Sequence, residues 1–250
     1  MNYNLSKKQL KRYSRQIILK NIGPLGQKKI IQSKVLIIGM GGLGCPVAEF
    51  LTRAGVGSLG IVDFDKVDLS NIHRQSLYDI DDIKKSKVIA AKEKLNRINS
   101  QTKVNSYNLR LNKKNQNRIL NNYEYIVDGS DNFETKLLIN DFCKKNKKFL
   151  VVGAISKFDG QIFTFDFKKK NTPCIRSFYQ ENTLSDDILN CEFSGILGTI
   201  AGTIGTLQSN EILKSILGIG RSLNGHILIV DLLNLNFRKV KYNKLKKFSK

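Results

Sequence analysis

The chain has 250 residues, which is enough for one large domain or two small ones with a well-buried core. Its 42 basic and 21 acidic residues give a net charge of +21, but the lysines are spread along the chain without the basic–aromatic interleaving of an RNA-binding sheet. We therefore expect no nucleic-acid partner. No apolar run approaches the ~18 residues of a membrane span, and the polar N-terminus lacks a signal-peptide core, so we expect a cytoplasmic protein with no membrane partner.

Helical and strand patterns alternate over the first 155 residues, which predicts an α/β fold with a doubly wound, mostly parallel sheet. A helix is expected over 5–20 and a short helix over 25–32. Strands follow at 35–38, 58–63, 104–109, 125–128 and 149–153, and helices between them at 46–54, 83–99, 113–120 and 133–145. Asp81 and Asp82 are the expected caps of the helix over 83–99.

The pattern changes after residue 155 and predicts an antiparallel C-terminal extension. An alternating strand is expected over 160–167, and a polar stretch with little periodicity runs from 168 to 194. A connection that long is usually functional or mobile. A long apolar helix over 196–218, suited to burial and to a subunit interface, precedes two final strands at 225–231 and 235–241.

A glycine-rich turn after the first strand is the centre of the chain. The spacing G-x-G-x-x-G, with one additional glycine, is formed by Gly39, Gly41, Gly42 and Gly44. Glycines let the backbone approach a phosphate, and the N-terminus of the following helix offers free N–H groups. The second strand ends in Asp63, where a carboxylate can accept ribose hydroxyls. These features alone permit ATP, NAD or FAD.

Polar residues at the ends of neighbouring strands favour ATP with Mg²⁺. Arg74 and Lys87 can neutralise a polyphosphate, and Asp131 can hold the Mg²⁺ that bridges it. A lysine at a helix start opposes the helix dipole, so a bound anion would explain Lys87. An NAD-dependent oxidoreductase remains an alternative, but it gives no reason for these three residues.

Matching segments in family order cover nearly the whole chain, and with them the chain resembles the ThiF/MoeB/HesA family of ubiquitin-activating-enzyme-like adenylyltransferases. The segments are Arg-Tyr-Ser-Arg-Gln at 12–16, Gly-Met-Gly-Gly-Leu-Gly at 39–44, Ala-Gly-Val-Gly at 54–57, Asp-Phe-Asp at 63–65, Leu-Ser-Asn-Ile-His-Arg-Gln at 69–75, Lys87, Asp-Gly-Ser-Asp-Asn at 128–132, Gly-Gln at 160–161, and Gly-Thr-Leu-Gln at 205–208 with Glu211.

The resemblance implies a Rossmann-like ATP-binding fold that adenylylates the C-terminal glycine carboxylate of a ubiquitin-like sulfur carrier ending in Gly-Gly. It further implies a homodimer and a sulfurtransferase or cysteine desulfurase as partner. One domain is expected over 1–250, with a nucleotide-binding half at 1–155, a carrier-binding half at 156–250 and a crossover segment at 168–194. Within the family, the segments at 12–16, 190–191 and 205–208 favour the thiamine branch, with a ThiS-like carrier; activation of a MoaD-type carrier for molybdopterin is the alternative.

The resemblance also assigns site residues. Catalysis is assigned to Arg74, Lys87, Asp131 and Cys191, with Mg²⁺ on Asp131. ATP contacts are assigned to Gly39, Gly41, Gly42, Gly44, Asp63, Asp65, Ser70, Asn71, Ile72, His73, Arg74, Lys87, Asp131 and Asn132, and to Arg15, expected from the partner subunit. Gly42 is where we expect the backbone to come closest to the triphosphate.

Two further comparisons with the family pattern concern cysteines. Relatives often hold a structural zinc with two C-x-x-C pairs, but this chain keeps only Cys174 of the first pair, so we expect no zinc. Cys191 aligns with the cysteine that links covalently to the carrier in thiamine-type enzymes, and the alternative is an inert residue. Loss of the zinc ligands also leaves open a non-catalytic binding module.

Overall fold

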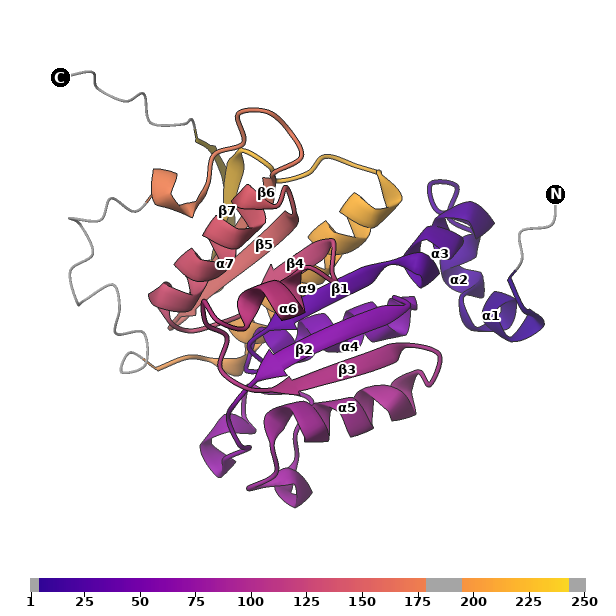
Figure 1. Cartoon of the computed structure of the whole chain (residues 1–250), viewed down its shortest axis with the longest axis horizontal. Coiled ribbons are helices and arrows are strands. Elements are labelled where there is room, and N and C mark those ends of the chain that lie inside the picture. Colours follow the sequence, from indigo (N-terminus) through magenta and orange to yellow (C-terminus); the bar gives the residue numbers. More distant parts are fainter. Residues whose placement is uncertain (1–4, 179–194, 243–250) are drawn as a thin grey trace.

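The structure, a computed structural model described here over residues 5–178 and 195–242, is built on one eight-stranded sheet (Figure 1). The strand order is β3-β2-β1-β4-β5-β6-β7-β8. The strands are β1 (Lys34–Ile38), β2 (Ser58–Asp63), β3 (Lys103–Asn108), β4 (Tyr125–Asp128), β5 (Phe149–Ser156), β6 (Asp159–Asp166), β7 (His226–Asp231) and β8 (Asn236–Lys241). The first five strands pair in parallel and β6, β7 and β8 are antiparallel, which confirms the predicted fold class.

Helices cover both faces of this sheet. The α-helices are α1 (Lys7–Arg12), α2 (Ser14–Ile17), α3 (Gly23–Gln32), α4 (Gly44–Ala54), α5 (Lys87–Ile98), α6 (Gln116–Leu120), α7 (Phe133–Lys145) and α9 (Gly198–Leu217). Short 3₁₀ turns are η1 (Leu69–Asn71), η2 (Ile80–Asp82) and η3 (Ile175–Ser177). No helix in the described ranges is both long and apolar enough to cross a bilayer.

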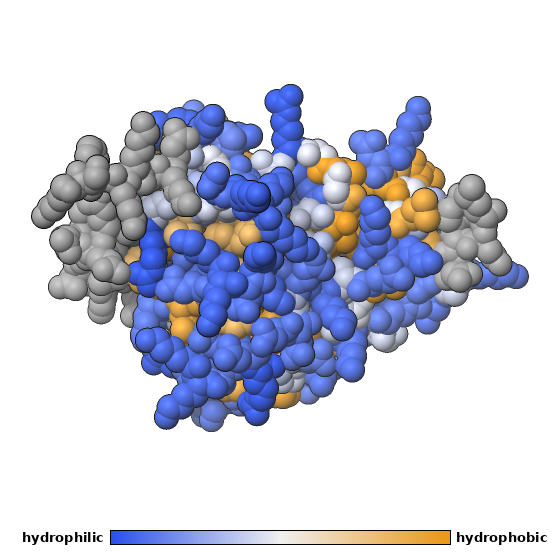
Figure 2. Space-filling view, turned by 45° about the horizontal axis from the view of Figure 1, so that its top comes forward, coloured by the Kyte–Doolittle hydropathy of each residue, from blue (hydrophilic) through white to orange (hydrophobic). Residues whose placement is uncertain are grey.

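Alternate residues of the parallel strands feed two separate cores. Val35 and Ile37 of β1 pack with α4, α5 and α9, whereas Leu36 and Ile38 pack with α6 and α7 on the opposite face. Because successive side chains of a strand point to opposite faces, near-continuous apolar strands are what a sheet covered on both sides requires. Outside these cores the surface is mainly polar, and hydrophilic side chains cover most of the face in Figure 2.

Two predicted helices differ from the structure. The helix expected over 5–20 is broken at Tyr13, which is 2% exposed and whose Oη accepts a 2.9 Å hydrogen bond from Asn99 Nδ2. The helix expected from 83 begins at Lys87, and Asp81 and Asp82 are not its caps. Both aspartates lie in η2, which Asp79 caps. Lys84 then adopts a left-handed conformation (φ 70°), which separates η2 from α5.

The strand order creates a crevice at the carboxyl ends of β1 and β4. Along the chain β1, β2 and β3 extend the sheet in one direction, and β4 and β5 extend it in the other. The connections after β1 and β4 therefore diverge, and open α/β sheets bind ligands at such a switch point. The two loops touch there, because a Cβ on Gly39 (φ 87°) would lie 2.7 Å from the carbonyl oxygen of Gly129.

Candidate functional site

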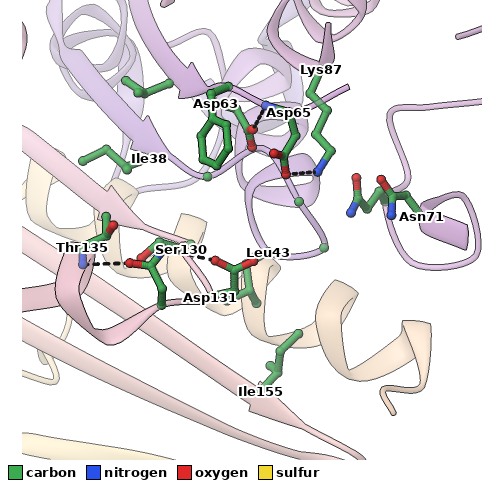
Figure 3. A pocket seen from close by; sticks show the side chains of 18 of the residues that line it. Ile38, Leu43, Asp63, Asp65, Asn71, Lys87, Ser130, Asp131, Thr135 and Ile155 are labelled. Carbon is green, nitrogen blue, oxygen red and sulfur yellow. Dashed lines mark hydrogen bonds and ion pairs between the residues drawn. The ribbon is translucent and has the colours of Figure 1, made fainter. Parts of the chain in front are cut away.

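A cavity of about 710 Å³ lies at these strand ends (Figure 3). Eleven of the predicted site residues line it: Gly39, Gly41, Gly42, Asp63, Asp65, Asn71, His73, Arg74, Lys87, Asp131 and Asn132. Three more of the predicted residues do not line the cavity, although each is next to a lining residue in the sequence: Gly44, Ser70 and Ile72. Arg15 is exposed on α2 and is not part of the lining, and Cys191 falls outside the described residues.

Glycine is suited to each position of the turn for a different structural reason. A Cβ on Gly44 would lie 1.9 Å from the carbonyl oxygen of Gly39, so this position needs glycine for backbone packing. A Cβ on Gly42 would lie 3.1 Å from Cβ of Ala201 on α9, which gives Gly42 a packing role beside the predicted one. At Gly41 the Cβ direction is open to the cavity, so the bare backbone here leaves room for a phosphate.

Asp63 is fixed by the backbone around it. Its Oδ2 accepts the Met40 N–H at 2.7 Å, and its Oδ1 accepts the Asp65 N–H at 2.8 Å. Burial raises the pKa of Asp63 above its ordinary value, while these hydrogen bonds and the charge of Lys87 oppose that rise. Each carboxylate oxygen keeps a further lone pair, so the group can accept hydroxyl protons from a ligand.

Lys87 is the first residue of α5 and pairs with Asp65. Its side chain is 8% exposed, and its Nζ donates to Asp65 Oδ2 at 3.0 Å (Figure 3). The Asp65 carboxylate thus offsets the unfavourable position of a lysine at a helix start, where we expected a bound anion. An ammonium has three donors, so Lys87 can still donate to a phosphate oxygen.

Arg74 and Asn71 come from the loop that contains η1. The Arg74 Nη1 donates to the Ser70 carbonyl at 2.9 Å and lies 2.8 Å from Nε2 of His73. Ser70 therefore acts on the site by orienting Arg74 rather than by lining the cavity. Asn71 lies on the same side of the cavity as Lys87 in Figure 3, so cationic and polar donors gather there.

Asp131 lies across the cavity, in the loop between β4 and α7. Asn132 caps α7 by accepting the Thr135 N–H at 2.9 Å, and its Nδ2 donates to Asp131 Oδ1 at 3.3 Å. Within the described part of the chain no three acidic, cysteine or histidine side chains form a metal-binding group. Mg²⁺ commonly binds one or two carboxylates together with substrate phosphates and water, and the exposed Asp131 suits that arrangement.

Several lining residues were missed by sequence reasoning. The Arg110 guanidinium lies 5.7 Å from the centre of the Phe64 ring, and Leu109 and Leu111 extend this wall next to Asp63. The signal available was position, because these residues follow the ends of β2 and β3 and so belong to the same edge of the sheet. Lys136 of α7 also lines the cavity, and no local pattern indicated it.

Cys174, the one cysteine left of the first C-x-x-C pair, is a buried free thiol. It is 4% exposed, and Lys144 Nζ lies 3.6 Å from its sulfur. Among the residues that the structure describes, no three His, Cys, Asp or Glu side chains gather around it. Protein groups anchor this segment: Arg176 forms two hydrogen bonds with Asp141, at 3.0 and 2.8 Å, and Asn140 Oδ1 accepts the backbone N–H of residue 175 at 3.1 Å. The donor set among these residues does not fit a tetrahedral zinc site.

Comparison with known proteins agrees with this geometry. The ThiF family model matches residues 13–249. A sulfur carrier protein adenylyltransferase of Thermus thermophilus is 40% identical over 238 residues, which cover 94% of this chain and 88% of that protein. The adenylyltransferase and sulfurtransferase MOCS3 of Drosophila virilis is 40% identical over 237 residues, 95% of this chain, but the chain spans only about half (52%) of that protein's length.

Solved structures share the fold at low sequence identity. E. coli MccB with ATP has a TM-score of 0.83 and 20% identity, with 98% of this chain and 75% of that chain covered. PaaA has a TM-score of 0.81 and 24% identity, with 96% and 76% covered. The family match and the 40% identity over most of the Thermus protein carry more weight than these fold matches. The chain therefore belongs to the ThiF family and is an adenylyltransferase.

Proposed function

We propose that this chain uses ATP to adenylylate the C-terminal glycine carboxylate of a ubiquitin-like sulfur carrier and releases pyrophosphate. The observation that carries the proposal is the convergence of Gly41, Asp63, Arg74, Lys87 and Asp131 on one cavity at the switch point of the sheet. The name of the Thermus thermophilus relative, a sulfur carrier protein adenylyltransferase, supports this class of substrate.

We place the nucleotide in the cavity with its base and its phosphates at opposite sides of Asp63. Leu109, Arg110, Leu111 and Phe64 form an apolar and aromatic wall for the base, next to Asp63 for the ribose. The triphosphate then extends over Gly41 toward Arg74, Asn71 and Lys87. Asp131 would hold Mg²⁺, which supplies charge neutralisation of the phosphates when bound.

The carrier tail enters from the side of the cavity opposite the base. Ala154 and Ile155 at the end of β5, and Gly195 and Ile196 just before α9, line that end. A carrier oxygen attacks the α-phosphorus of ATP, and the bond between that phosphorus and the oxygen bridging to the β-phosphorus breaks. The attacking carboxylate is already ionised at pH 7, so no general base is needed. The enzyme contributes positioning and stabilisation of the developing negative charge.

The finer assignments are also proposals. We place the nucleotide-binding half at 1–155 and the carrier-binding half at 156–250. We favour a ThiS-like carrier of the thiamine branch, with a MoaD-type carrier as the alternative, and a homodimer in which Arg15 reaches the partner's phosphates. Cys191 would link covalently to the activated carrier, and a sulfurtransferase or cysteine desulfurase would supply sulfur for the thiocarboxylate.

Carrier-dependent ATP–pyrophosphate exchange tests the reaction. Purified ThiS-like and MoaD-like carriers ending in Gly-Gly are compared with the same carriers lacking the last glycine. Exchange only with an intact carrier supports the proposal and identifies the branch. Calorimetric binding of NAD⁺ in place of ATP–Mg²⁺ would favour an oxidoreductase, and ATP binding without exchange for any carrier would favour a non-catalytic module.

Two variants test the partner-dependent roles. Arg15→Ala is expected to lose exchange by itself but to regain part of it when mixed with Lys87→Ala, because a mixed dimer contains one site with both residues intact. Cys191→Ser is expected to impair carrier thiocarboxylation, and full thiocarboxylation by this variant would show that Cys191 has no covalent role.

A further inference from the structure

One charged pair, between Lys136 at the cavity wall and the buried Asp128, has no part in the roles assigned above. Asp128, the last residue of β4, is fully buried, and its Oδ2 lies 3.4 Å from Nζ of Lys136 in α7. The Lys136 side chain is 12% exposed, and its Nζ also donates to the Gly153 carbonyl of β5 at 2.9 Å. The ammonium thus joins the ends of two strands to a helix. A buried carboxylate is costly unless it is paired and hydrogen-bonded, and Asp128 is both.

Asp128 also shapes the turn that carries Asp131. Its Oδ1 accepts the Ser130 N–H at 2.9 Å and the Ser130 hydroxyl at 2.6 Å. These two bonds fix the backbone immediately before Asp131. The Asp131 side chain is itself exposed and receives a long 3.3 Å hydrogen bond from Asn132. The backbone of this turn, more than side-chain packing, therefore sets where the Asp131 carboxylate lies.

We propose that Lys136 is a positioning residue for the nucleotide site. By holding the Asp128 carboxylate against Ser130, its ammonium determines where Asp131 presents its carboxylate to the triphosphate and Mg²⁺. The inference rests on the proposed function, because it requires the role given there to Asp131. A methionine at 136 keeps the apolar stem but removes the donors, whereas an arginine keeps the charge and donors for both acceptors.

A double-mutant cycle measured by calorimetric titration of ATP–Mg²⁺ tests this role. Lys136→Met is expected to weaken binding roughly ten- to hundredfold, as for other residues that orient a metal ligand. Lys136→Arg is expected to recover most of the affinity. Lys145→Met, an equal change at an exposed position of the same helix, is the matched control and should bind like the unmodified chain. Asp131→Ala combined with Lys136→Met should bind no more weakly than Asp131→Ala alone, because both changes act through one contact.

Multiplied losses in the double variant, or unchanged binding by Lys136→Met, would overturn the positioning role. Thermal unfolding of each variant checks folding, and if Lys136→Met does not fold, Ser130→Ala takes its place in the same cycle with the same expected non-additivity. The cycle needs no carrier, so its result is separate from the proposed function. Absence of exchange with every carrier would overturn the reaction, whereas multiplied losses in the binding cycle would overturn only the role of Lys136.

Discussion

Lys87 is almost wholly buried, yet its ammonium donates to the carboxylate of Asp65, a side chain that is 46% exposed. The pair joins the end of β2 to the start of α5, with Asp63 two residues before Asp65 held by backbone N–H groups. A cation in this position is fixed before any nucleotide arrives. The donors that meet the phosphates therefore need little rearrangement, which is the condition under which charge stabilisation is most effective.

Removing any of the three charged residues of the phosphate site should abolish most adenylation. Lys87→Ala, Arg74→Ala and Asp131→Ala are each expected to cost about 3–4 kcal/mol of transition-state stabilisation, as for the loss of one preorganised charge stabiliser. Carrier-dependent ATP–pyrophosphate exchange measures the loss. Arg97→Ala, an exposed change near the end of α5, serves as control. Near-normal exchange in all three variants would show that the site is assigned incorrectly.

Alanine at two glycines of the same turn should separate binding from folding. Gly41→Ala places a methyl group into the cavity, where the nearest recorded atom is Gln75 Nε2 at 3.7 Å, so ATP affinity should fall while stability is nearly unchanged. Gly44→Ala forces a contact of 1.9 Å with the Gly39 carbonyl oxygen and should cost about 1–3 kcal/mol of stability or more. Urea unfolding and ATP titration of both variants would reveal the contrast, and equal stability losses would contradict it.

The Arg176–Asp141 pair should make a pH-dependent contribution to stability. Arg176 is the main cause of the lowered pKa of Asp141, so folding favours the ionised carboxylate. The contribution is therefore present above the ordinary pKa of an aspartate and is lost as the pH falls through the lowered value. Because both side chains are substantially exposed, Arg176→Met should cost only about 0.2–1 kcal/mol at pH 7. Urea unfolding at pH 7 and near pH 3 should show this difference shrinking on acidification; a constant difference would mean that packing, not charge, is responsible.

Chelation should leave the fold unchanged. Cys174 is buried beside Lys144, and its segment is anchored by Arg176, Asp141 and Asn140 rather than by thiolate ligands. Dialysis against EDTA is therefore expected to leave the thermal unfolding midpoint where it was, and metal analysis should find no stoichiometric zinc. One tightly bound zinc per chain, with a lower midpoint after its removal, would contradict this expectation.

Local motifs made much of the site predictable. The glycine turn, Asp63, and the polar residues after β2 and β4 follow strand ends, and parallel topology brings strand ends to one edge of the sheet. Lys136 could not be found in this way, because its relation to Asp128 and Gly153 depends on how α7 packs across two strands. The same holds for the pairing of Lys87 with Asp65, because the sequence analysis explained this lysine at a helix start only by a bound anion.

Tertiary contacts also account for the break in the N-terminal helix, which was predicted as continuous. Tyr13 interrupts the N-terminal helix because its ring is needed in the interior, where it receives the Asn99 hydrogen bond and packs on Gly55. A Cβ on Gly55 would lie 2.5 Å from the Tyr13 ring. Periodicity alone gives no sign of this contact, because Gly55 lies 42 positions after Tyr13 in the sequence. Local propensity therefore predicts the elements better than their ends.

The contact between Gly39 and Gly129 has a consequence for how the protein pays the entropy of ligand binding. The Gly129 N–H donates to the Ile38 carbonyl at 2.8 Å, and a Cβ on Gly39 would collide with the Gly129 backbone, so the loops after β1 and β4 form one rigid floor. The conformational entropy of that floor is lost during folding and not again when a nucleotide binds. The entropy lost on binding should therefore come mainly from ordering of the nucleotide and little from ordering of the protein.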